Sequence, residues 1–397
     1  MDQNIGEEIL GKTKSIPSWI IILLGLIALA GVATFIINTS GNNPSTAWHI
    51  FHVNFLFWTA AAQGGIIFSC ILRITDARWG RSYLRISEGL ASFLPLAFVF
   101  LIVVFIGKNY LLPYATHHYH NPKDLWLNIP FVFSRNVIGV AILMVLDFFY
   151  LKYSIKQDYD SGTEESKGYF RKLRKLAPAI VIVYTIVFSI IAFDFIMSLD
   201  EHWFSTLFGV YYLIGGLISA AAATVILSIG LKNYLGLDDY FSDYHYWDMG
   251  KILQGFALLW VYLMFSQLLV IWYGNMPEES VFLVKRLKTV PFETFAWSVL
   301  TCCFIFPFFS LLPRTNKIVT PILAFIATVS FSGLWLDKFI LVIPSYSDTI
   351  SFGVQEILIT AGFLSAFLGC FLYFVNKFPV IPYGDPLFDG KSSRGGH

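Results

Sequence analysis

A stretch near the middle of the chain joins an apolar run to acids and a histidine. Residues 192–205 read AFDFIMSLDEHWFS, and the preceding APAIVIVYTIVFSII is apolar enough to cross a bilayer. Asp194 lies inside the run, whereas Asp200, Glu201 and His202 stand at its end. An ionisable side chain in hydrocarbon is expensive, so it normally faces a bundle interior and finds a partner. Asp194 is therefore a candidate for proton transfer or ligand binding.

Two further polar side chains are expected at the depth of Asp194, on other apolar segments. His52 lies in the first two turns of one segment, and Arg135 lies in the outer half of another. Together the three side chains would bind one polar head group, and a carboxylate with limited water beside a guanidinium suits proton transfer. The alternative is structural: Arg135 and Asp194 form a buried ion pair that fixes helix register, and His52 is a satisfied interior histidine.

A second set of polar side chains lies at other points within the apolar segments. These are Glu88, Asp147, Lys251, Gln267, Glu293, Asp337 and Lys338. They are expected to belong to a proton pathway. Within it, half-channels from either face would contain Glu88, Asp147, Lys251 and Asp337. For Asp337 and Lys338 the competing interpretation is an interfacial pair in which Lys338 reaches outward. For the residues of this set that lie near the inner face, the competing interpretation is charge pairing at helix ends.

Composition places the chain among polytopic membrane proteins. Of its 397 residues 56% are hydrophobic and 13% are charged, whereas a soluble domain carries about 25% charged residues. A net charge of +1 gives no bulk attraction to nucleic acid. The N-terminus is polar and acidic and has no cleavage-site pattern, so the first span is expected to be an uncleaved anchor.

The four cysteines, Cys70, Cys302, Cys303 and Cys370, lie inside apolar runs without a C-x-x-C pair. This argues against a disulfide scaffold, a zinc site and an iron–sulfur cluster held by the chain alone. The histidines of the loop ATHHYHNP are interpreted as incidental, so no metal site is predicted. The sequence does not place a pair of histidines at mid-membrane on two different helices. It therefore gives only weak support for haem ligation by this chain.

Ten apolar segments are long enough to cross a hydrocarbon core. They run approximately over 18–38, 48–72, 84–107, 126–151, 176–199, 203–230, 247–273, 291–313, 318–343 and 351–375. An even number of spans puts both termini on one side. Of the 27 Lys and Arg residues, 19 fall on that side and 5 on the other. The positive-inside rule therefore predicts cytoplasmic termini.

An internal repeat is expected in this pattern. PAIVIVYTIVFSIIAFD (178–194) and PILAFIATVSFSGLWLD (321–337) share five residues at a fixed offset of 143, including Asp194 and Asp337. RISEGLA (85–91) also matches KILQGFA (251–257). Both matches join helices four spans apart, which predicts an all-α protein with two parallel-repeat four-helix bundles, helices 2–5 and 6–9, flanked by helices 1 and 10. The corresponding units are 1–47, 48–200, 201–343 and 344–397.

Three blocks of sequence point to a known family. They are HVNFLFWTAAAQGG with ITDARWGRSYLRISEG, FDFIMSLDEHWFSTLFGVYYLIGG, and MGKILQGFALLWVYLMFSQLLVIWYGNMPEE. These blocks resemble the ActF-type subunits of bacterial alternative complex III, which are NrfD/PsrC-like membrane anchors of a quinol:electron-acceptor oxidoreductase. The resemblance covers helices 2 to 9. The motif-matching positions are Asp194, Asp200, His202, Gln267, Tyr273 and Glu279.

The resemblance implies a subunit that contacts quinol near the periplasmic face and conducts protons. Quinol would be the substrate, and no haem or iron–sulfur cluster would be bound by this chain. The implied partners are an iron–sulfur protein, multihaem and monohaem cytochromes c, a paralogous NrfD-like subunit, and lipids. A proton-coupled secondary transporter stays open as an alternative, because parallel repeats and charges within the spans also fit that class of protein. A purely structural anchor of a redox complex, with no ligand, is the second alternative.

Overall fold

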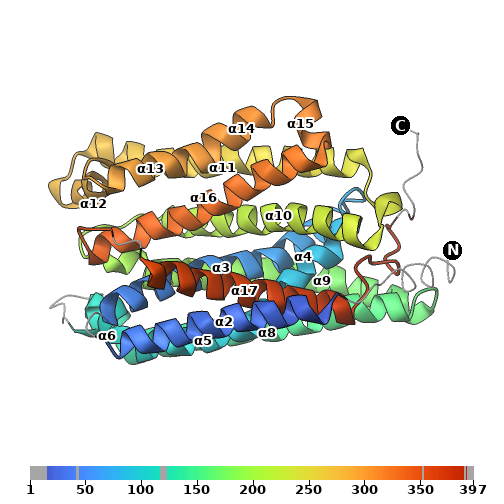
Figure 1. Ribbon diagram of the computed structural model, residues 1–397, viewed down its shortest axis with the longest axis horizontal. Helices are drawn as coiled ribbons and strands as arrows, with labels where there is room; N and C mark the ends of the chain where they lie inside the picture. The colour runs from blue at the N-terminus through green and yellow to red at the C-terminus, as the bar shows by residue number, and fades with distance from the viewer. Residues whose placement is uncertain (1–15, 42–43, 117–122, 351–352, 389, 391–397) are drawn as a thin grey trace.

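The computed structural model describes residues 16–41, 44–116, 123–350, 353–388 and 390. Within these residues all regular elements are helices, and ten helical stretches are long and apolar enough to span a membrane (Figure 1). The prediction of an all-α chain with ten helices long and apolar enough to span a membrane is therefore confirmed for the described residues. The loop histidines at 117, 118 and 120 lie outside the described residues.

Seven spans are single helices and three are composite. The single helices are α2 (Ser18–Thr39), α3 (Pro44–Ile74), α8 (Ile129–Tyr159), α10 (Phe208–Leu235), α11 (Asp243–Gly274), α16 (Thr320–Tyr346) and α17 (Val354–Lys377). The first composite span consists of η1 (Arg81–Tyr83), α4 (Leu84–Leu90), η2 (Ala91–Phe93) and α5 (Leu94–Ile106). The second consists of α9 (Glu164–Phe195) and η4 (Met197–Leu199). The third consists of α13 (Phe292–Leu300), the π-helical η6 (Thr301–Ile305) and α14 (Phe306–Ser310). The short connecting helices are α6 (Lys108–Leu111), η3 (Pro113–Ala115), α7 (Lys123–Trp126), η5 (Asp238–Tyr240), α12 (Pro277–Leu287) and α15 (Arg314–Ile318).

The loop expected over 152–175 is mostly helical. α8 continues to Tyr159, and α9 begins at Glu164 after a short turn. Thr163 caps α9, because its hydroxyl accepts a hydrogen bond from the backbone N–H of Ser166 at 3.3 Å. Charged residues extend these helices beyond the apolar runs, which a hydropathy pattern alone does not predict.

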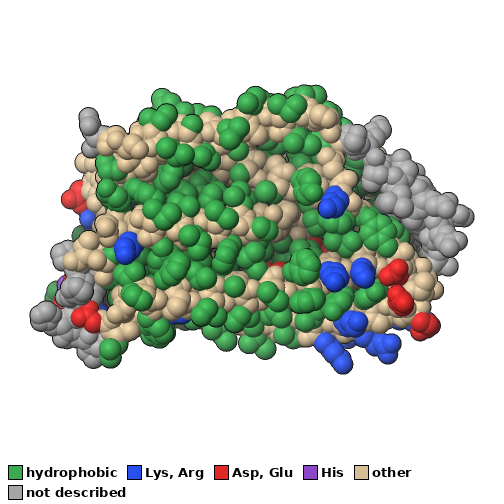
Figure 2. All heavy atoms as spheres, turned by 90° about the horizontal axis from the view of Figure 1, so that it is seen from below, with side chains coloured by type: hydrophobic (Ala, Val, Ile, Leu, Met, Phe, Trp, Pro, Cys, Tyr) green, Lys and Arg blue, Asp and Glu red, His purple; other side chains and the backbone are tan. Residues whose placement is uncertain are grey.

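The first and last spans meet at one end of the molecule. The backbone N–H of Ile16 donates to Oδ1 of Asn376 at 3.0 Å, which ties the start of α2 to the end of α17. We call this end the terminal end and the opposite end, which carries α6 and α12, the distal end (Figure 1). Figure 2 shows one face with hydrophobic side chains over its middle and with Lys and Arg gathered toward the terminal end.

The core is built around α3 and α10. α3 is buried along nearly its whole length, and it packs against α4, α9, α10, α16 and α17. Close approach to α10 depends on small residues: a Cβ on Gly64 would lie 2.5 Å from the carbonyl oxygen of Gly216. Polar side chains on the inner face of α3 are consequently removed from both lipid and water.

The remaining spans group around these two helices. In the first half of the chain α3 packs against α4, α5 and α9, while α8 packs against α5 and α9. In the second half α10 packs against α11 and α16, while α13 packs against α16 and α14 against α11 and α16. This arrangement is compatible with the predicted pair of repeated bundles, and the repeat itself stays a prediction.

Candidate functional site

Arg135 and Asp194 form a buried ion pair near the distal end of the first half. Nε of Arg135 donates to Oδ2 of Asp194 at 2.9 Å, and Nη2 donates to Oδ1. Nδ2 of Asn136 donates to Oδ2 at 2.6 Å. Nη1 of Arg135 donates to the carbonyl oxygen of Trp126 at 2.8 Å, and the guanidinium lies 3.9 Å from the centroid of that indole ring. Each partner is therefore well satisfied inside the protein.

His52 is not part of this pair. Its Nδ1 lies 2.9 Å from the hydroxyl of Tyr346, and within the described residues it makes no hydrogen bond with Arg135 or Asp194. Its ring instead packs edge-on against Phe195 at 6.2 Å. The structure thus joins Arg135 and Asp194 by hydrogen bonds. His52 bonds to Tyr346 of α16 and packs its ring against Phe195 of α9, the neighbour of Asp194 in the chain.

This geometry favours a structural role for the Arg135–Asp194 pair. A carboxylate that already accepts three hydrogen bonds has little capacity left for a ligand hydroxyl. A bidentate Arg–carboxylate pair also fixes the relative position of two helices, here α8 and α9. The ion pair with Arg135 is sufficient to explain why Asp194 stands inside an apolar run.

A different site in the second half has both space and polar groups. A cavity of about 320 Å³ lies between α10, α11, α12, α13 and α16, and we call it the distal pocket. Its wall includes Tyr211, Gln267, Arg286 and Asp337, and the rest is mainly apolar or aromatic. Small-molecule sites typically combine an apolar cavity with a few convergent polar groups.

Asp337 is the buried acid of the distal pocket. Its Oδ1 accepts a hydrogen bond from the hydroxyl of Tyr211 on α10, and its Oδ2 lies 2.8 Å from Nζ of Lys338. Asp337 and Lys338 are both 1% exposed. The expected outward reach of Lys338 to the interface is therefore wrong, because its ammonium turns back onto its neighbour and lies 5.0 Å from the ring of Tyr212. The ion pair is buried inside the second half.

α12 covers the distal pocket and is fastened by an arginine. Pro344 lacks an N–H, so the carbonyl of Ile340 has no donor from the next turn of α16. Nε of Arg286 donates to that carbonyl at 3.1 Å, and Nη2 donates to the carbonyl of Leu341 at 2.8 Å. Burial lowers the pKa of Arg286 to about 9, which leaves the guanidinium protonated at neutral pH.

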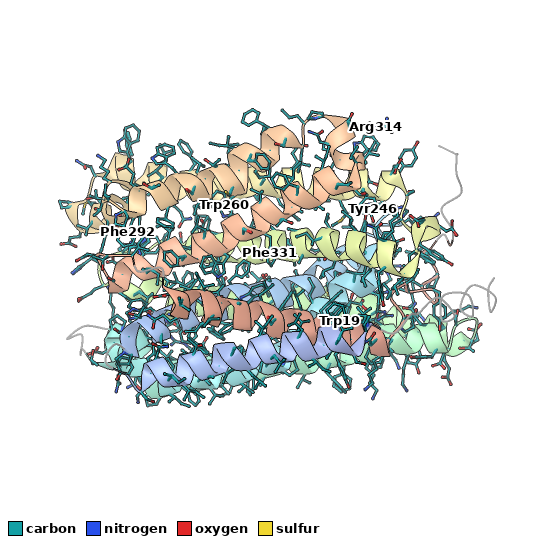
Figure 3. The ribbon with its side chains drawn as sticks, viewed as in Figure 1. Trp19, Tyr246, Trp260, Phe292, Arg314 and Phe331 are labelled. Atoms are coloured by element: carbon teal, nitrogen blue, oxygen red, sulfur yellow. The ribbon has the colours of Figure 1, made fainter. Side chains whose placement is uncertain are left out.

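Aromatic rings form the roof of this pocket. Phe282 of α12 stacks on Trp203 with ring centroids 3.7 Å apart and planes 2° from parallel. Trp260 of α11, labelled in Figure 3, lies with its ring centroid 5.7 Å from that of Tyr211 in the pocket wall. Phe292, at the start of α13, is seen near the distal end in the same view. Planar faces at this position suit a flat aromatic ligand.

A larger groove of about 580 Å³ runs between α3, α10, α16 and α17, where Phe331 lies (Figure 3). Its wall is almost wholly apolar. The carboxylate of Glu356 at its edge already caps α17 by accepting from the N–H of Gly353 at 2.7 Å. This groove suits hydrocarbon chains and offers little chemistry.

Glu88 belongs to a buried charge network at the terminal end. Nη1 of Arg85 lies 2.7 Å from its Oε2, and Nη2 of Arg73 lies 3.4 Å from its Oε1. The C-terminal segment enters the same network, because Asp385 lies 2.8 Å from Arg73 and 3.2 Å from Arg81. The C-terminal segment is thus packed into the protein over 379–385.

The other predicted proton-pathway residues differ in their surroundings. Asp147 is 2% exposed on α8 and faces Gln63 of α3. Lys251 is exposed and pairs with Asp248 at 2.5 Å, as expected for charges at a helix end. Glu293 lines a shallow hollow on the outer side of α13, and the side chain of Gln267 donates to its own helix at Leu263.

Comparison of the chain with protein-family models and with curated proteins finds no match. Within the part of the chain that the structure describes, no group of three or more His, Cys, Asp or Glu side chains is placed to hold a metal ion. The geometry of the distal pocket therefore carries the functional argument.

Proposed function

We propose that this chain is the membrane subunit of a quinol:electron-acceptor oxidoreductase and that it binds the quinol head group in the distal pocket. The observation that carries the proposal is the buried carboxylate of Asp337 at the wall of an aromatic-roofed cavity. A quinol has a flat ring and two hydroxyl donors, which match stacked aromatic rings and a carboxylate acceptor. The sequence resemblance to alternative complex III subunits supports the same ligand.

The chemistry assigns Asp337 the role of proton acceptor. One quinol hydroxyl would donate to the carboxylate, and Gln267 would contact the opposite side of the ring. Oxidation of the quinol to quinone releases two electrons and two protons. The electrons would pass to an iron–sulfur or haem partner subunit, and the protons would leave through Asp337 toward the distal end. Lys338 stabilises the ionised carboxylate between turnovers.

The charge pattern supports an orientation for this reaction. Lys and Arg gather toward the terminal end, so we infer cytoplasmic termini and a periplasmic distal end in a bacterial inner membrane. Protons released at the distal pocket would then enter the periplasm. Partners that accept the electrons, such as cytochromes c, would dock at the same end.

The proposed repeat gives the two halves different tasks. Asp194 and Asp337 occupy equivalent positions in the sequence match. Both carboxylate oxygens of Asp194 bond to Arg135, whereas Asp337 pairs with Lys338 and borders a cavity. We infer that the first copy keeps a structural pair and the second copy has become the ligand site.

Quinone binding to the full-length protein in nanodiscs tests the proposal. Quinones quench tryptophan fluorescence, and Trp203 lies in the pocket wall. Saturable quenching by a short-chain quinone is expected, with an affinity about 10- to 100-fold lower in Asp337→Asn, because a hydrogen bond to a charged group contributes about 1.5–3 kcal/mol. Asp147→Asn, a buried acid elsewhere, serves as the matched control and should bind normally.

The rival functions predict other results. A structural anchor would show no saturable quenching. A secondary transporter would carry a solute across vesicle membranes without any partner subunit. Its tryptophan quenching by a quinone would be the same in wild type and in Asp337→Asn. Either result would refute the quinol proposal.

A further inference from the structure

A group of basic side chains lies at the terminal end of the second half. α15 connects the span that ends at Ser310 to the span that begins at Thr320, and it packs against α11 and α16. It carries Arg314 and Lys317, and Figure 3 shows Arg314 toward the terminal end. Among the described residues, neither of these two side chains makes a hydrogen bond or an ion pair. Two positive charges therefore stand at one end of the molecule without a counter-ion in that part of the chain.

Lys317 is covered by the protein although it carries a charge. It is 7% exposed, and its stem lies over Gly250 of α11, where an added Cβ would lie 2.7 Å from Cγ of the lysine. Burial and, in second place, the ammonium of Lys251 lower the pKa of Lys317 below its ordinary value. Lysines are almost never buried to this extent unless they are paired. The missing anion is therefore expected from outside the described part of the chain.

An indole ring of α11 collects the other two cations. Nζ of Lys251 lies 4.3 Å from the ring centroid of Trp247, and Cζ of Arg314 lies 4.6 Å from the same ring. Asp248 pairs with Lys251 at 2.5 Å, and Asp243 is exposed at the start of α11. Three cations, Lys317 included, thus meet two carboxylates, and the cluster keeps an excess of positive charge.

Apolar side chains border this cluster on the side of the spans. Phe309 of α14 is 57% exposed, Leu312 after it is 56% exposed, and Phe325 of α16 is 61% exposed. α14 and α16 belong to helical stretches that are long and apolar enough to span a membrane, so these side chains suit contact with hydrocarbon. A phospholipid has the matching profile, with a phosphate at the level of the helix ends and acyl chains along the span.

We propose that Lys251, Arg314 and Lys317 bind the phosphodiester head group of an anionic phospholipid of the phosphatidylglycerol type, whose acyl chains lie along α14. Arg and Lys form charge-assisted hydrogen bonds with phosphate oxygens, and basic pockets between spans recognise lipid head groups in this way. The excess positive charge disfavours a zwitterionic lipid, because that lipid brings a cation of its own. The site lies at the opposite end from the distal pocket and does not depend on quinol binding.

Native mass spectrometry of the full-length protein, delipidated in detergent, tests this site. Phosphatidylglycerol and phosphatidylcholine with identical acyl chains are titrated separately, and the first dissociation constant is measured for each. Wild type should prefer phosphatidylglycerol by about 10-fold or more. Arg314→Gln should weaken phosphatidylglycerol binding about 10-fold, and Arg314→Gln combined with Lys317→Gln about 100-fold, because each loses a charge-assisted contact. Phosphatidylcholine binding should not change.

Arg174→Gln is the matched control. Arg174 stands at the same end of the molecule, but its Nη2 pairs with Oδ2 of Asp76 at 2.9 Å. This variant should bind phosphatidylglycerol as wild type does. Arg314 is exposed, so Arg314→Gln should keep the wild-type Tm in lipid-free detergent, and a loss of lipid binding would then not reflect unfolding.

Two further measurements distinguish the possible ligands and sites. Inorganic phosphate in millimolar excess should not displace phosphatidylglycerol, and displacement would overturn the assignment to a lipid in favour of a soluble anion. Asp337→Asn should lose quinone binding but keep the lipid preference, which separates this site from the proposed function. Equal wild-type affinity for the two lipids, as expected if these cations meet a carboxylate of a partner protein, would overturn the proposal. Unchanged phosphatidylglycerol affinity in the double variant would do the same.

Discussion

Tyr211 and Asp337 are hydrogen-bonded to each other across α10 and α16, and the bond lies in the wall of the distal pocket. It joins the central helix of the second half to the helix that carries the buried acid. The hydroxyl occupies one carboxylate oxygen while Lys338 occupies the other. The carboxylate is thus oriented by two donors and keeps lone pairs for a third.

Replacing Tyr211 by Phe should destabilise the protein. The change removes a neutral donor from a buried carboxylate and leaves the ring in place, so unfolding in detergent should become easier by about 1.5–3 kcal/mol. A bound quinol can supply the missing donor. The stabilisation by a quinol analogue, measured as a shift in Tm, should therefore be larger in Tyr211→Phe than in wild type. An equal shift in both proteins would argue against contact between quinol and Asp337.

Replacing Asp194 by Asn should affect stability rather than quinone binding. Removal of one partner leaves the Arg135 guanidinium without its counter-ion, and such changes cost about 3–5 kcal/mol. The double variant Arg135→Met with Asp194→Leu should recover much of that loss, since a hydrophobic replacement of both partners is often neutral. Chemical unfolding gives the stability, and quinone titration gives the affinity. If Asp194→Asn had normal stability but had lost quinone binding, the quinone site would have to lie at Asp194 in the first half.

Replacing Asp385 by Asn should release the C-terminal segment. Arg73 and Arg81 would both lose a carboxylate at the terminal end, and Gly384 leaves no room for adjustment because a Cβ there would lie 2.1 Å from the carbonyl oxygen of Gln157. Limited proteolysis should cut the C-terminus of the variant faster than that of wild type. Glu165→Gln, at an exposed acid on α9, is the control and should leave the rate unchanged. Equal cleavage of all three proteins would show that the segment is held by other contacts.

Acid should loosen the attachment of α12. Nζ of Lys285 lies 2.8 Å from Oδ1 of Asp348, and this hydrogen bond lowers the pKa of the Asp348 carboxyl below its ordinary value. Because the pKa of Asp348 is lower in the folded state than in the unfolded state, the pair stabilises the fold at pH values above the unfolded-state pKa, near 3.9. This stabilisation is lost as the pH falls through the folded-state pKa. Hydrogen exchange of α12 should accelerate across this range. The acceleration should be smaller in Lys285→Met, and identical profiles would exclude the pair as a latch.

The spans were predictable because hydropathy depends on composition over about twenty residues. All ten appear near their expected positions, and the pairing of Arg135 with Asp194 follows from two costly charges at similar depth. The hydrogen bond of His52 to Tyr346 could not be predicted, because depth does not define the direction in which a side chain points around its helix. Tyr346, its actual partner, lies at the end of a distant span and carries no charge to mark it.

The distal pocket was harder to predict for a related reason. Its cover, α12, is too short to be recognised as a span, and its attachment depends on the carbonyl that Pro344 leaves free. Gln267 and Asp337 were noted as polar residues in apolar segments, but nothing in their spacing indicates that they border one cavity.

The most direct test of the account is photoaffinity mapping with a quinone that carries a photoreactive ring substituent, applied to the full-length protein in nanodiscs. Labelling should fall on α12 and on the neighbouring part of α13, around Phe282 and Trp297, and an excess of unlabelled quinone should prevent it. Asp337→Asn should strongly reduce this labelling. Saturable labelling around Arg135 on α8 and α9, with α12 unlabelled, would contradict the assignment of the quinol site to the distal pocket.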